Sequence, residues 1–318
     1  MPPHFWLWVV VGFTAFGVIY WRVHQGRLES RKSAVMAKQR AVAVALGPKI
    51  QPFREQVEGW VRELAADGPG DFIAPGARLA GLREAPGVYL RLRQANAKSS
   101  KEIRSAAQRS LLDGFTSCLF VSPSSLPTEG PSCRVTSDCE PGLLCNEWNV
   151  CAPPPRPYNM RLAYRALRVL SSEWTDELHL ADSELGVSAY DRDLDSVAKH
   201  DVPVAVEIMS KARFVTLVID EDPAGGLPPA EPESTESAEE RLQRLPHFAR
   251  VGIWDVESRT PLLRLRAEAS GDFVAVGGRK VTDPAIAAAQ ARQANSCSLA
   301  LTVRARIDAA AAAGQQAP

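Results

Sequence analysis

The longest apolar run in the chain lies at its amino-terminal end. Residues 5–21 read FWLWVVVGFTAFGVIYW, with no charged residue and with aromatic residues at both ends. A helix of this length covers about 25 Å, close to the hydrocarbon thickness of a bilayer, and aromatic residues favour the membrane interfaces. Large residues follow the run, which argues against a signal-peptidase site. The pattern predicts an uncleaved single-pass transmembrane anchor over residues 5–21 rather than a buried core helix.

Helical spacing of apolar residues continues after this run. A sparse stripe in a polar, alanine-rich context is followed by a dense stripe between Ile50 and Leu64. The sequence DGPG at residues 67–70 favours a stop. We therefore predict a helical arm over residues 22–70.

Alternating positions predict the strands. In residues 88–93, apolar residues alternate with Tyr89, Arg91 and Arg93, which is the period of a half-buried strand. The run FVTLVI at residues 214–219 is apolar and β-branched and predicts a buried strand. Further strands, the first two of them joined as a hairpin, are predicted at residues 248–256, 262–269 and 273–276.

Helices are predicted between and after these strands. A capping box formed by Ser99 and Glu102 begins a helix that should continue through Leu119. Pro284 occupies the first turn of a long alanine-rich helix. Two more helices are predicted at residues 163–178 and at residues 202–212, the latter opened by Pro203, and a mobile loop is predicted at residues 221–240.

This order of elements predicts the α+β class. We expect a small antiparallel sheet of about four strands, packed with helices on one face. The chain then divides into the anchor, the arm, a first half of the α+β domain, a linker with a cysteine-rich insert, a second half and a disordered tail. The boundaries of these segments are 5–21, 22–70, 71–122, 123–157, 158–308 and 309–318.

Four evenly spaced cysteines dominate the candidate chemistry. Cys133, Cys139, Cys145 and Cys151 follow a C-x5-C-x5-C-x5-C pattern between proline-rich linkers. Zinc ligands usually come as close pairs two to four residues apart, and no histidine lies near, so a metal site is not favoured. Two disulfides fit better, and the sequence leaves all three possible pairings open.

The residues Ser137, Asp138, Cys139, Gly142 and Cys145 also suggest a relationship. They resemble the small cysteine-rich repeats of secreted proteins, similar to the Dickkopf N-terminal cysteine-rich module and its bacterial relatives. The resemblance covers residues 133–151 alone, and this run lacks the further cysteines of the animal module. It implies a disulfide-stapled extracytoplasmic insert and carries no implication of signalling.

Cys118 and Cys297 are the other two thiols, each on a predicted helix near an apolar face. An even number of cysteines in an oxidising compartment favours a bridge between them. The alternative is two buried free thiols that pack as small hydrophobic side chains.

The charges and the cysteines disagree about topology. Basic residues after the anchor, with none before it, would keep the following residues in the cytoplasm: Arg22, Arg27, Arg31, Lys32, Lys38 and Arg40. Cytoplasmic thiols stay reduced, however, and large domains translocate despite flanking charge. We give the cysteines more weight and predict that most of the chain is extracytoplasmic.

Composition and motifs limit the function. The chain has 37 basic and 37 acidic residues, which does not indicate a nucleic-acid partner. It contains no zinc-protease, nucleophile-elbow or phosphate-loop motif, and we predict no catalytic residue and no cofactor. The acidic run at Asp191, Asp193 and Asp195 lacks the glycine and glutamate of a calcium loop.

We expect a membrane-anchored envelope protein with an interaction or structural role and a protein partner. A tethered enzyme, such as a hydrolase, is the alternative.

Overall fold

The chain folds into two compact units, which are described separately below. A computed structural model describes residues 5–66, 70–75, 77, 79–110, 113–120, 130–134, 138–140, 143–145, 149–152, 157–232, 234–269 and 284–315. The first unit comprises residues 1–48 and 165–203, and the second comprises residues 49–164 and 204–318. The chain passes between the units within three helices: α1 (Phe5–Ala65), α5 (Arg161–Arg168) and α7 (Glu184–Lys211).

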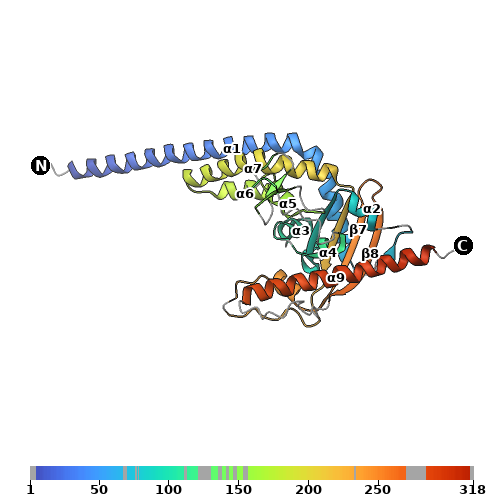
Figure 1. Cartoon of the computed structure of the whole chain (residues 1–318). Coiled ribbons are helices and arrows are strands. Elements are labelled where there is room, and N and C mark those ends of the chain that lie inside the picture. The colour runs from blue at the N-terminus through green and yellow to red at the C-terminus, as the bar shows by residue number, and fades with distance from the viewer. Residues whose placement is uncertain are drawn as a thin grey trace. The chain divides into compact units, whose positions relative to one another are not determined.

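Helix α1 runs without a break through the predicted anchor and most of the predicted arm (Figure 1). The predicted transmembrane helix is not supported, because in the described part of the chain no helix carries an apolar stretch long enough to cross a bilayer. The side chains of residues 5–10, 13 and 20 lie outside that part. Among the described residues of the run, Phe16, Ile19 and Trp21 are exposed.

The first unit packs α6 (Ser172–Leu180) and part of α7 against α1. Helix α6 is antiparallel to α1, since Gln39 bonds the Ser171 carbonyl and Lys32 bonds the His179 carbonyl. Helix α7 is parallel to α1, because Arg31 pairs with Glu184 and Lys38 with Asp191. Their shared core contains Leu28, Val35, Val169, Trp174, Leu178, Val187 and Leu194.

The second unit is built on a six-stranded sheet in the order β1-β8-β7-β6-β2-β5. The α+β class is confirmed, but the sheet is larger than expected and is mixed rather than antiparallel. β2 pairs in parallel with both β5 and β6, and the other pairs are antiparallel. The strands are β1 (Phe72–Ile73), β2 (Gly87–Arg93), β5 (Tyr158–Asn159), β6 (Phe214–Asp220), β7 (His247–Asp255) and β8 (Pro261–Ala269).

Helices cover both faces of this sheet, not one face as predicted. On one face, α4 (Phe115–Phe120) and α9 (Pro284–Gln315) contribute Phe115, Leu299 and Val303 to a core that also contains Val251 and Leu265 of the sheet. The other face receives the carboxyl-terminal part of α1. There the Trp60 ring stacks on Trp254 with centroids 5.6 Å apart.

Several predicted helices have different limits. The helix capped by Ser99 ends at Ala107 as α3 (Ser100–Ala107), and α4 begins anew at Phe115, whose amide bonds the Asp113 side chain. The helix predicted at 163–178 is divided into α5 and α6, because Ser171 caps a new helix through the Trp174 amide. Pro203 lies inside α7 instead of opening a helix.

The remaining differences concern loops and the tail. The loop predicted at 221–240 ends earlier, where a capping box between Ser237 and Glu240 starts α8 (Ala238–Arg244). The tail predicted to be disordered is helical in α9 as far as Gln315. The strand predicted at 273–276 lies outside the described residues. The other short elements are α2 (Leu79–Glu84), a 3-10 turn (Gln94–Asn96), β3 (Leu144–Cys145) and β4 (Cys151–Ala152).

Gly252 provides a test of the packing between the sheet and α1. A Cβ at this position would overlap the Trp254 ring and lie 3.3 Å from Leu64. Trp254 is fully buried, so the ring has no free space to enter. We expect Gly252→Ala to lower the free energy of unfolding by about 1–3 kcal/mol, as overpacking does in other cores. Urea denaturation followed by tryptophan fluorescence measures this change.

Gly81 is the matched control, since a Cβ there meets nothing within 4 Å and the residue lies in helix α2. Gly81→Ala should leave stability unchanged or raise it slightly, because alanine favours helix more than glycine does. Equal stability of the two variants would show that the contact between Trp254 and α1 is looser than described.

Candidate functional site

A buried arginine lies at the centre of the sheet. Arg91 is on β2, which has a neighbouring strand on each side over part of its length. The side chain is 1% exposed, although its position in the alternating pattern predicts the solvent-facing side. The half-buried strand prediction is therefore wrong: residues 87–92 are all buried, and a charged side chain in such a strand requires partners.

Asp220 is the first of these partners. It ends β6, whose parallel register places it opposite Arg93, two residues beyond Arg91. Arg91 donates from Nε to Asp220 Oδ2 at 2.8 Å and from Nη2 to Oδ1 at 2.6 Å. This two-bond geometry is the strongest common pairing between arginine and a carboxylate.

Asp113 is the second partner and comes from the turn before α4. Arg91 Nη1 donates to Asp113 Oδ2 at 3.0 Å, and the Tyr89 hydroxyl donates to the same carboxylate. The Phe115 amide donates to Asp113 Oδ1 at 3.0 Å, so the residue also caps the first turn of α4. One carboxylate thus joins the sheet to the start of a helix.

His247, at the start of β7, lies against the same pair. Its Nε2 is 2.9 Å from Asp220 Oδ1, and its Nδ1 is 2.7 Å from the Leu245 carbonyl oxygen. Both of these neighbours are hydrogen-bond acceptors, and Arg91 Nη2 lies 3.3 Å from the same Nε2, so the ring contacts both members of the ion pair.

Helix α9 closes the cluster from the side of the core. Ser296 Oγ accepts from Arg91 Nη1 at 3.0 Å, and Asn295 Nδ2 donates to the carbonyls of Gln243 and Leu245. Cys297, which follows Ser296 on α9, forms a disulfide with Cys118 of α4. Of the two alternatives that the sequence left open for these cysteines, the structure has the bridge and not two free thiols. It joins α4, which follows Asp113, to α9, which holds Ser296.

The electrostatics follow from burial combined with pairing. Burial alone would raise the pKa of Asp220, but Arg91 and His247 hold that pKa well below its usual range. Burial would lower the pKa of Arg91, and the two aspartates instead raise it well above the ordinary value. Burial, together with the charge of Asp113, raises the pKa of Tyr89 well above its ordinary value. The geometry therefore favours ionised Arg91 and Asp220 and an un-ionised Tyr89.

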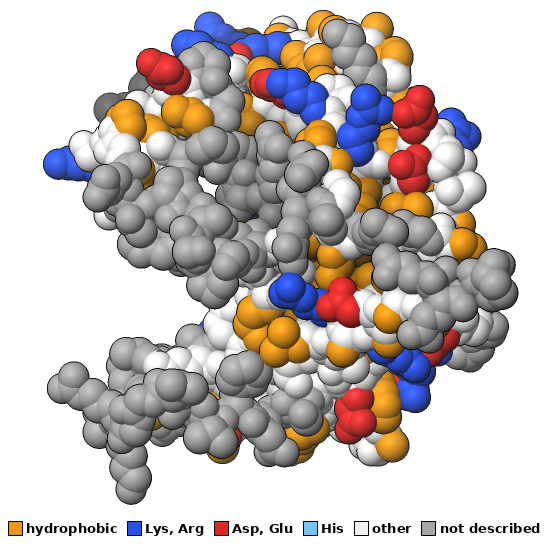
Figure 2. All heavy atoms as spheres, turned by 45° about the vertical axis from the view of Figure 1, so that its right-hand side comes forward, with side chains coloured by type: hydrophobic (Ala, Val, Ile, Leu, Met, Phe, Trp, Pro, Cys, Tyr) orange, Lys and Arg blue, Asp and Glu red, His pale blue; other side chains and the backbone are white. Residues whose placement is uncertain are grey.

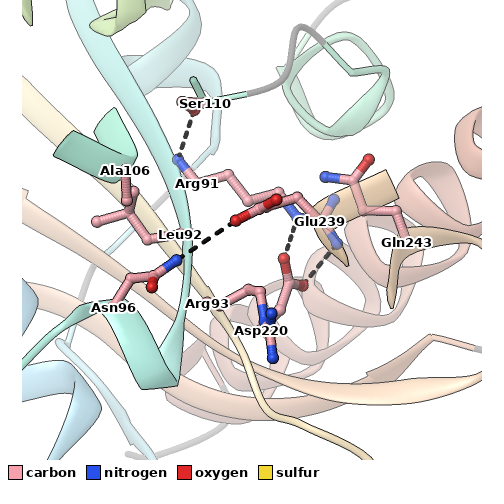
Figure 3. A pocket seen from close by; sticks show the side chains of 9 residues that line it. All are labelled: Arg91, Leu92, Arg93, Asn96, Ala106, Ser110, Asp220, Glu239 and Gln243. Carbon is pink, nitrogen blue, oxygen red and sulfur yellow. Dashed lines mark hydrogen bonds and ion pairs between the residues drawn. The ribbon is translucent and has the colours of Figure 1, made fainter. Parts of the chain in front are cut away.

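A pocket borders this network at the ends of β2 and β6 (Figure 3). Its cavity volume is about 10 Å³, close to the smallest space that holds one water molecule. Arg91 and Asp220 face each other across hydrogen bonds, and Asn96 reaches Glu239 over the pocket. Gln243 Oε1, which has no donor among the described residues, also lines it. An organic substrate does not fit this space.

A second charged group, nearer the surface, connects three segments of the sheet. Glu221 accepts from Arg250 on β7 at 2.8 Å and from Arg266 on β8 at 2.7 Å. Partial burial opposes ionisation, but the two arginines lower the pKa of Glu221. Arg266 also stacks over the Phe248 ring at 3.9 Å.

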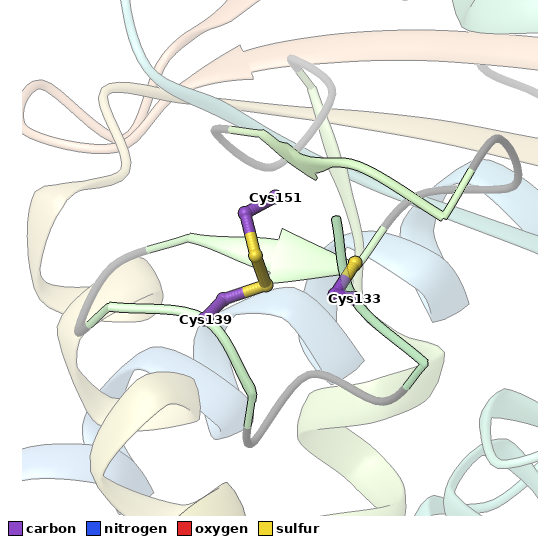
Figure 4. Close-up of side chains that lie close together, drawn as sticks. All are labelled: Cys133, Cys139 and Cys151. Atoms are coloured by element: carbon purple, nitrogen blue, oxygen red, sulfur yellow. A yellow bond between two sulfur atoms is a disulfide. The ribbon is translucent and has the colours of Figure 1, made fainter. Parts of the chain in front are cut away.

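The four evenly spaced cysteines form two disulfides. Cys133 pairs with Cys145 and Cys139 with Cys151, which selects one of the three pairings left open. The strands β3 and β4 form a two-stranded sheet in which Cys145 lies opposite Cys151. Figure 4 shows the bridge between Cys139 and Cys151. The predicted disulfide bonding of this cysteine-rich segment is confirmed.

These sulfurs also lie close to one another. The sulfur atoms of Cys133, Cys139 and Cys151 are all within 4.8 Å of one another. A bonded sulfur is not a thiolate, and the thiolate is the form that ligates metal. In the oxidised state described, this group is therefore two adjacent disulfides rather than a metal site.

Basic and acidic side chains are interspersed on the surface. On the face in Figure 2, described lysines and arginines lie near aspartates and glutamates rather than forming one large patch. The acidic residues on α7 also have a basic neighbour, since Lys38 pairs with Asp191 and Asp195. The aspartates lie inside α7 and not at its start.

The sequence did not identify Arg91, Asp113, Asp220 and His247 as a group. They come from separate segments of the chain, and no motif spans them. One signal was present: Asp220 ends a fully buried strand whose only other polar residue is Thr216, and an acidic residue there requires a partner. Comparisons of the chain with protein-family models, with curated proteins and with solved structures give no match.

Replacing Arg91 tests how strongly the network supports the fold. Arg91→Met removes the guanidinium but keeps a long side chain, and it leaves Asp113 and Asp220 buried without their main counter-charge. We expect the free energy of unfolding to fall by about 3–5 kcal/mol, as it does when one partner of a buried pair is removed. Urea denaturation followed by circular dichroism gives this difference.

Arg93 on the same strand is the control. Its pair with Asp222 is partly exposed, and exposed pairs contribute about 0–1 kcal/mol. Arg93→Met should therefore change stability little. If the two variants were equally stable, the buried network would not be a main support of the fold.

The lowered pKa of Glu221 predicts a pH dependence. A carboxyl group with a lowered pKa in the folded state adds stability above its ordinary pKa of about 4.3, and this is lost as pH falls below that value. Wild type should therefore be more stable than Glu221→Gln at neutral pH, and the difference should shrink as pH falls below about 4. Urea denaturation over this pH range measures the difference.

Glu257→Gln is the comparison variant, since Glu257 forms a highly exposed pair with Arg213. It should follow the wild-type curve. A difference between wild type and Glu221→Gln that stayed constant over the range would contradict the predicted pH dependence.

Proposed function

We propose that this protein is a membrane-anchored, extracytoplasmic protein of the cell envelope with an interaction or structural role. The observation that carries the proposal is the pairing of all six cysteines in three disulfides. Disulfides persist in oxidising compartments, whereas cytosolic thiols are kept reduced. The resemblance of residues 133–151 to small cysteine-rich repeats of secreted proteins agrees with this location.

Residues 5–21 supply the proposed membrane anchor. The run has no charge, and its described large apolar side chains point away from any core, with Phe16, Val18, Ile19 and Trp21 all exposed. Exposed apolar residues in such number along one helix are unusual for a surface in water. A lipid environment accounts for them.

An interaction or structural role is favoured over catalysis. The buried network has the perturbed pKa values that often mark active sites, which is the observation in favour of a tethered enzyme such as a hydrolase. Its charged groups bond one another, however, and the adjacent pocket holds about one water molecule. The network therefore suits a rigid scaffold that presents a surface to a protein partner in the envelope.

Thiol labelling of cells tests the proposed location. Cells that produce the full chain are treated with a membrane-impermeant maleimide before and after a membrane-impermeant reductant. We expect no labelling before reduction and labelling of intact cells after it, because the cysteines are oxidised and face outward. Peptide mapping without reduction should recover the pairs 133–145, 139–151 and 118–297.

The same experiment separates the alternatives. Free thiols that label only in lysed cells would overturn both the extracytoplasmic location and the disulfides in the cell. Oxidised cysteines in a protein that washes off the membrane with salt would keep the compartment and overturn the anchor.

A further inference from the structure

Exposed apolar side chains gather at one end of the first unit. Along α1 they begin in the proposed anchor and continue to Val23: Val11, Phe16, Val18, Ile19, Trp21 and Val23. Two more lie on either side of the turn between α6 and α7, where Leu180 is 83% exposed and Leu185 is 76% exposed. In this unit, the one other large apolar side chain that is described as exposed is Val44.

Hydrogen bonds and ion pairs fix the position of that turn along α1. Lys32 Nζ donates to the His179 carbonyl at 2.9 Å, and Arg31 pairs with Glu184 at 3.0 Å. Leu28, one helical turn nearer to the anchor, packs in the same core as Leu178 and Val187. The α6–α7 turn, residues 180–185, therefore lies beside residues 28–32 of α1.

This position is close to the proposed membrane surface. Residue 28 lies seven residues after Trp21, which is about 10 Å along a helix. The headgroup layer extends about 5–7 Å beyond the hydrocarbon on each side of a bilayer. A transmembrane helix is usually tilted by about 20°. A helix packed beside it, on the side toward which it leans, would then lie about 3 Å closer to the membrane. Leucine side chains on the turn are thus within reach of the headgroups.

The two leucines are exposed because their neighbours already fill the bundle core. Leu178 and Val187 are buried between the helices, and Ser183 caps α7 by accepting from the Gly186 amide at 3.2 Å. Leu180 and Leu185 lie outside this packing and do not contribute to the core. A polar residue at either position would serve the bundle equally well.

Basic residues lie between the anchor and the turn. Arg22 and Arg27 follow the anchor along α1 at the expected level of the lipid headgroups, whereas Arg31 pairs with Glu184 of the turn. Arginine near a membrane surface is attracted to anionic lipids while its stem covers apolar groups. The same end of the unit therefore offers both apolar and basic side chains.

We propose that the α6–α7 turn is a second membrane contact, in which Leu180 and Leu185 enter the headgroup layer of the bilayer that holds residues 5–21. The occupant of this apolar surface is lipid, because the turn lies beside residues 28–32 of α1, within two helical turns of the exposed apolar run that ends at Val23. The inference rests on the proposed anchor. The contact would orient the helical bundle of the first unit against the membrane.

Photocrosslinking in vesicles tests the contact without adding a thiol. The full chain is made with p-benzoyl-phenylalanine in place of Leu180, Leu185, Val44 or Phe16, one position at a time, and is reconstituted in phosphatidylcholine vesicles that contain phosphatidylglycerol and a trace of fluorescent lipid. All four positions are exposed, so the bulky side chain should not disturb packing. After irradiation, the fluorescent lipid bound to the protein is measured on a gel.

We expect lipid adducts from positions 180, 185 and 16. Position 44 should give none above background, since it lies about 35 Å beyond Trp21 along α1 and is matched to Leu180 in exposure. Adducts at position 16, with 180 and 185 equal to 44, would overturn the second contact and leave the anchor in place. No adduct at position 16 would overturn the anchor itself, and the second contact with it.

Discussion

The fold of the second unit depends on keeping one buried guanidinium paired. Arg91 is enclosed by the sheet and by α9, so its charge must be balanced inside the protein. Its two carboxylates come from positions 22 and 129 residues further along the chain. Such a group tolerates few alternative arrangements, because moving any one partner leaves a charge buried without compensation. We infer that it selects the arrangement of β2, β6 and the turn before α4.

The disulfide between Cys118 and Cys297 acts on the same junction. Asp113 caps α4, which holds Cys118, and Ser296 precedes Cys297 on α9. The covalent bond and the ionic network therefore join the same two segments to each other and to the sheet. The other two disulfides have a different role, since each joins cysteines 12 residues apart around the β3–β4 pair.

The charged groups inside the second unit bond one another. The charges in the interior satisfy one another, and the space beside them is about the size of one water molecule. Exposed apolar side chains lie instead along the start of α1 and at the α6–α7 turn. An ordinary water-facing helix carries few exposed apolar side chains. If the protein acts by binding another molecule, these two surfaces are therefore its candidate contact sites.

The sequence by itself determined the features that depend on local pattern. Periodicity identified β6, the β7–β8 hairpin and the start of α9, because each is set by the alternation or capping of nearby residues. The cysteine pattern predicted two bridges within the insert and left a third, between Cys118 and Cys297, open against two free thiols. It did not predict the pairing within the insert, since all four cysteines there are near one another in sequence. The breaks after α3 and α5 were missed because short polar caps at Asp113 and Ser171 outweighed a continuous apolar stripe.

The tertiary structure alone decided the parallel pairing of β2 and the burial of Arg91. An alternating strand looks the same whether its polar face meets water or the charged partners of distant segments. Asp113, Asp220 and His247 become partners only when the sheet and α9 bring them together. The identity of each residue was visible in the sequence, but the distances between them are properties of the fold.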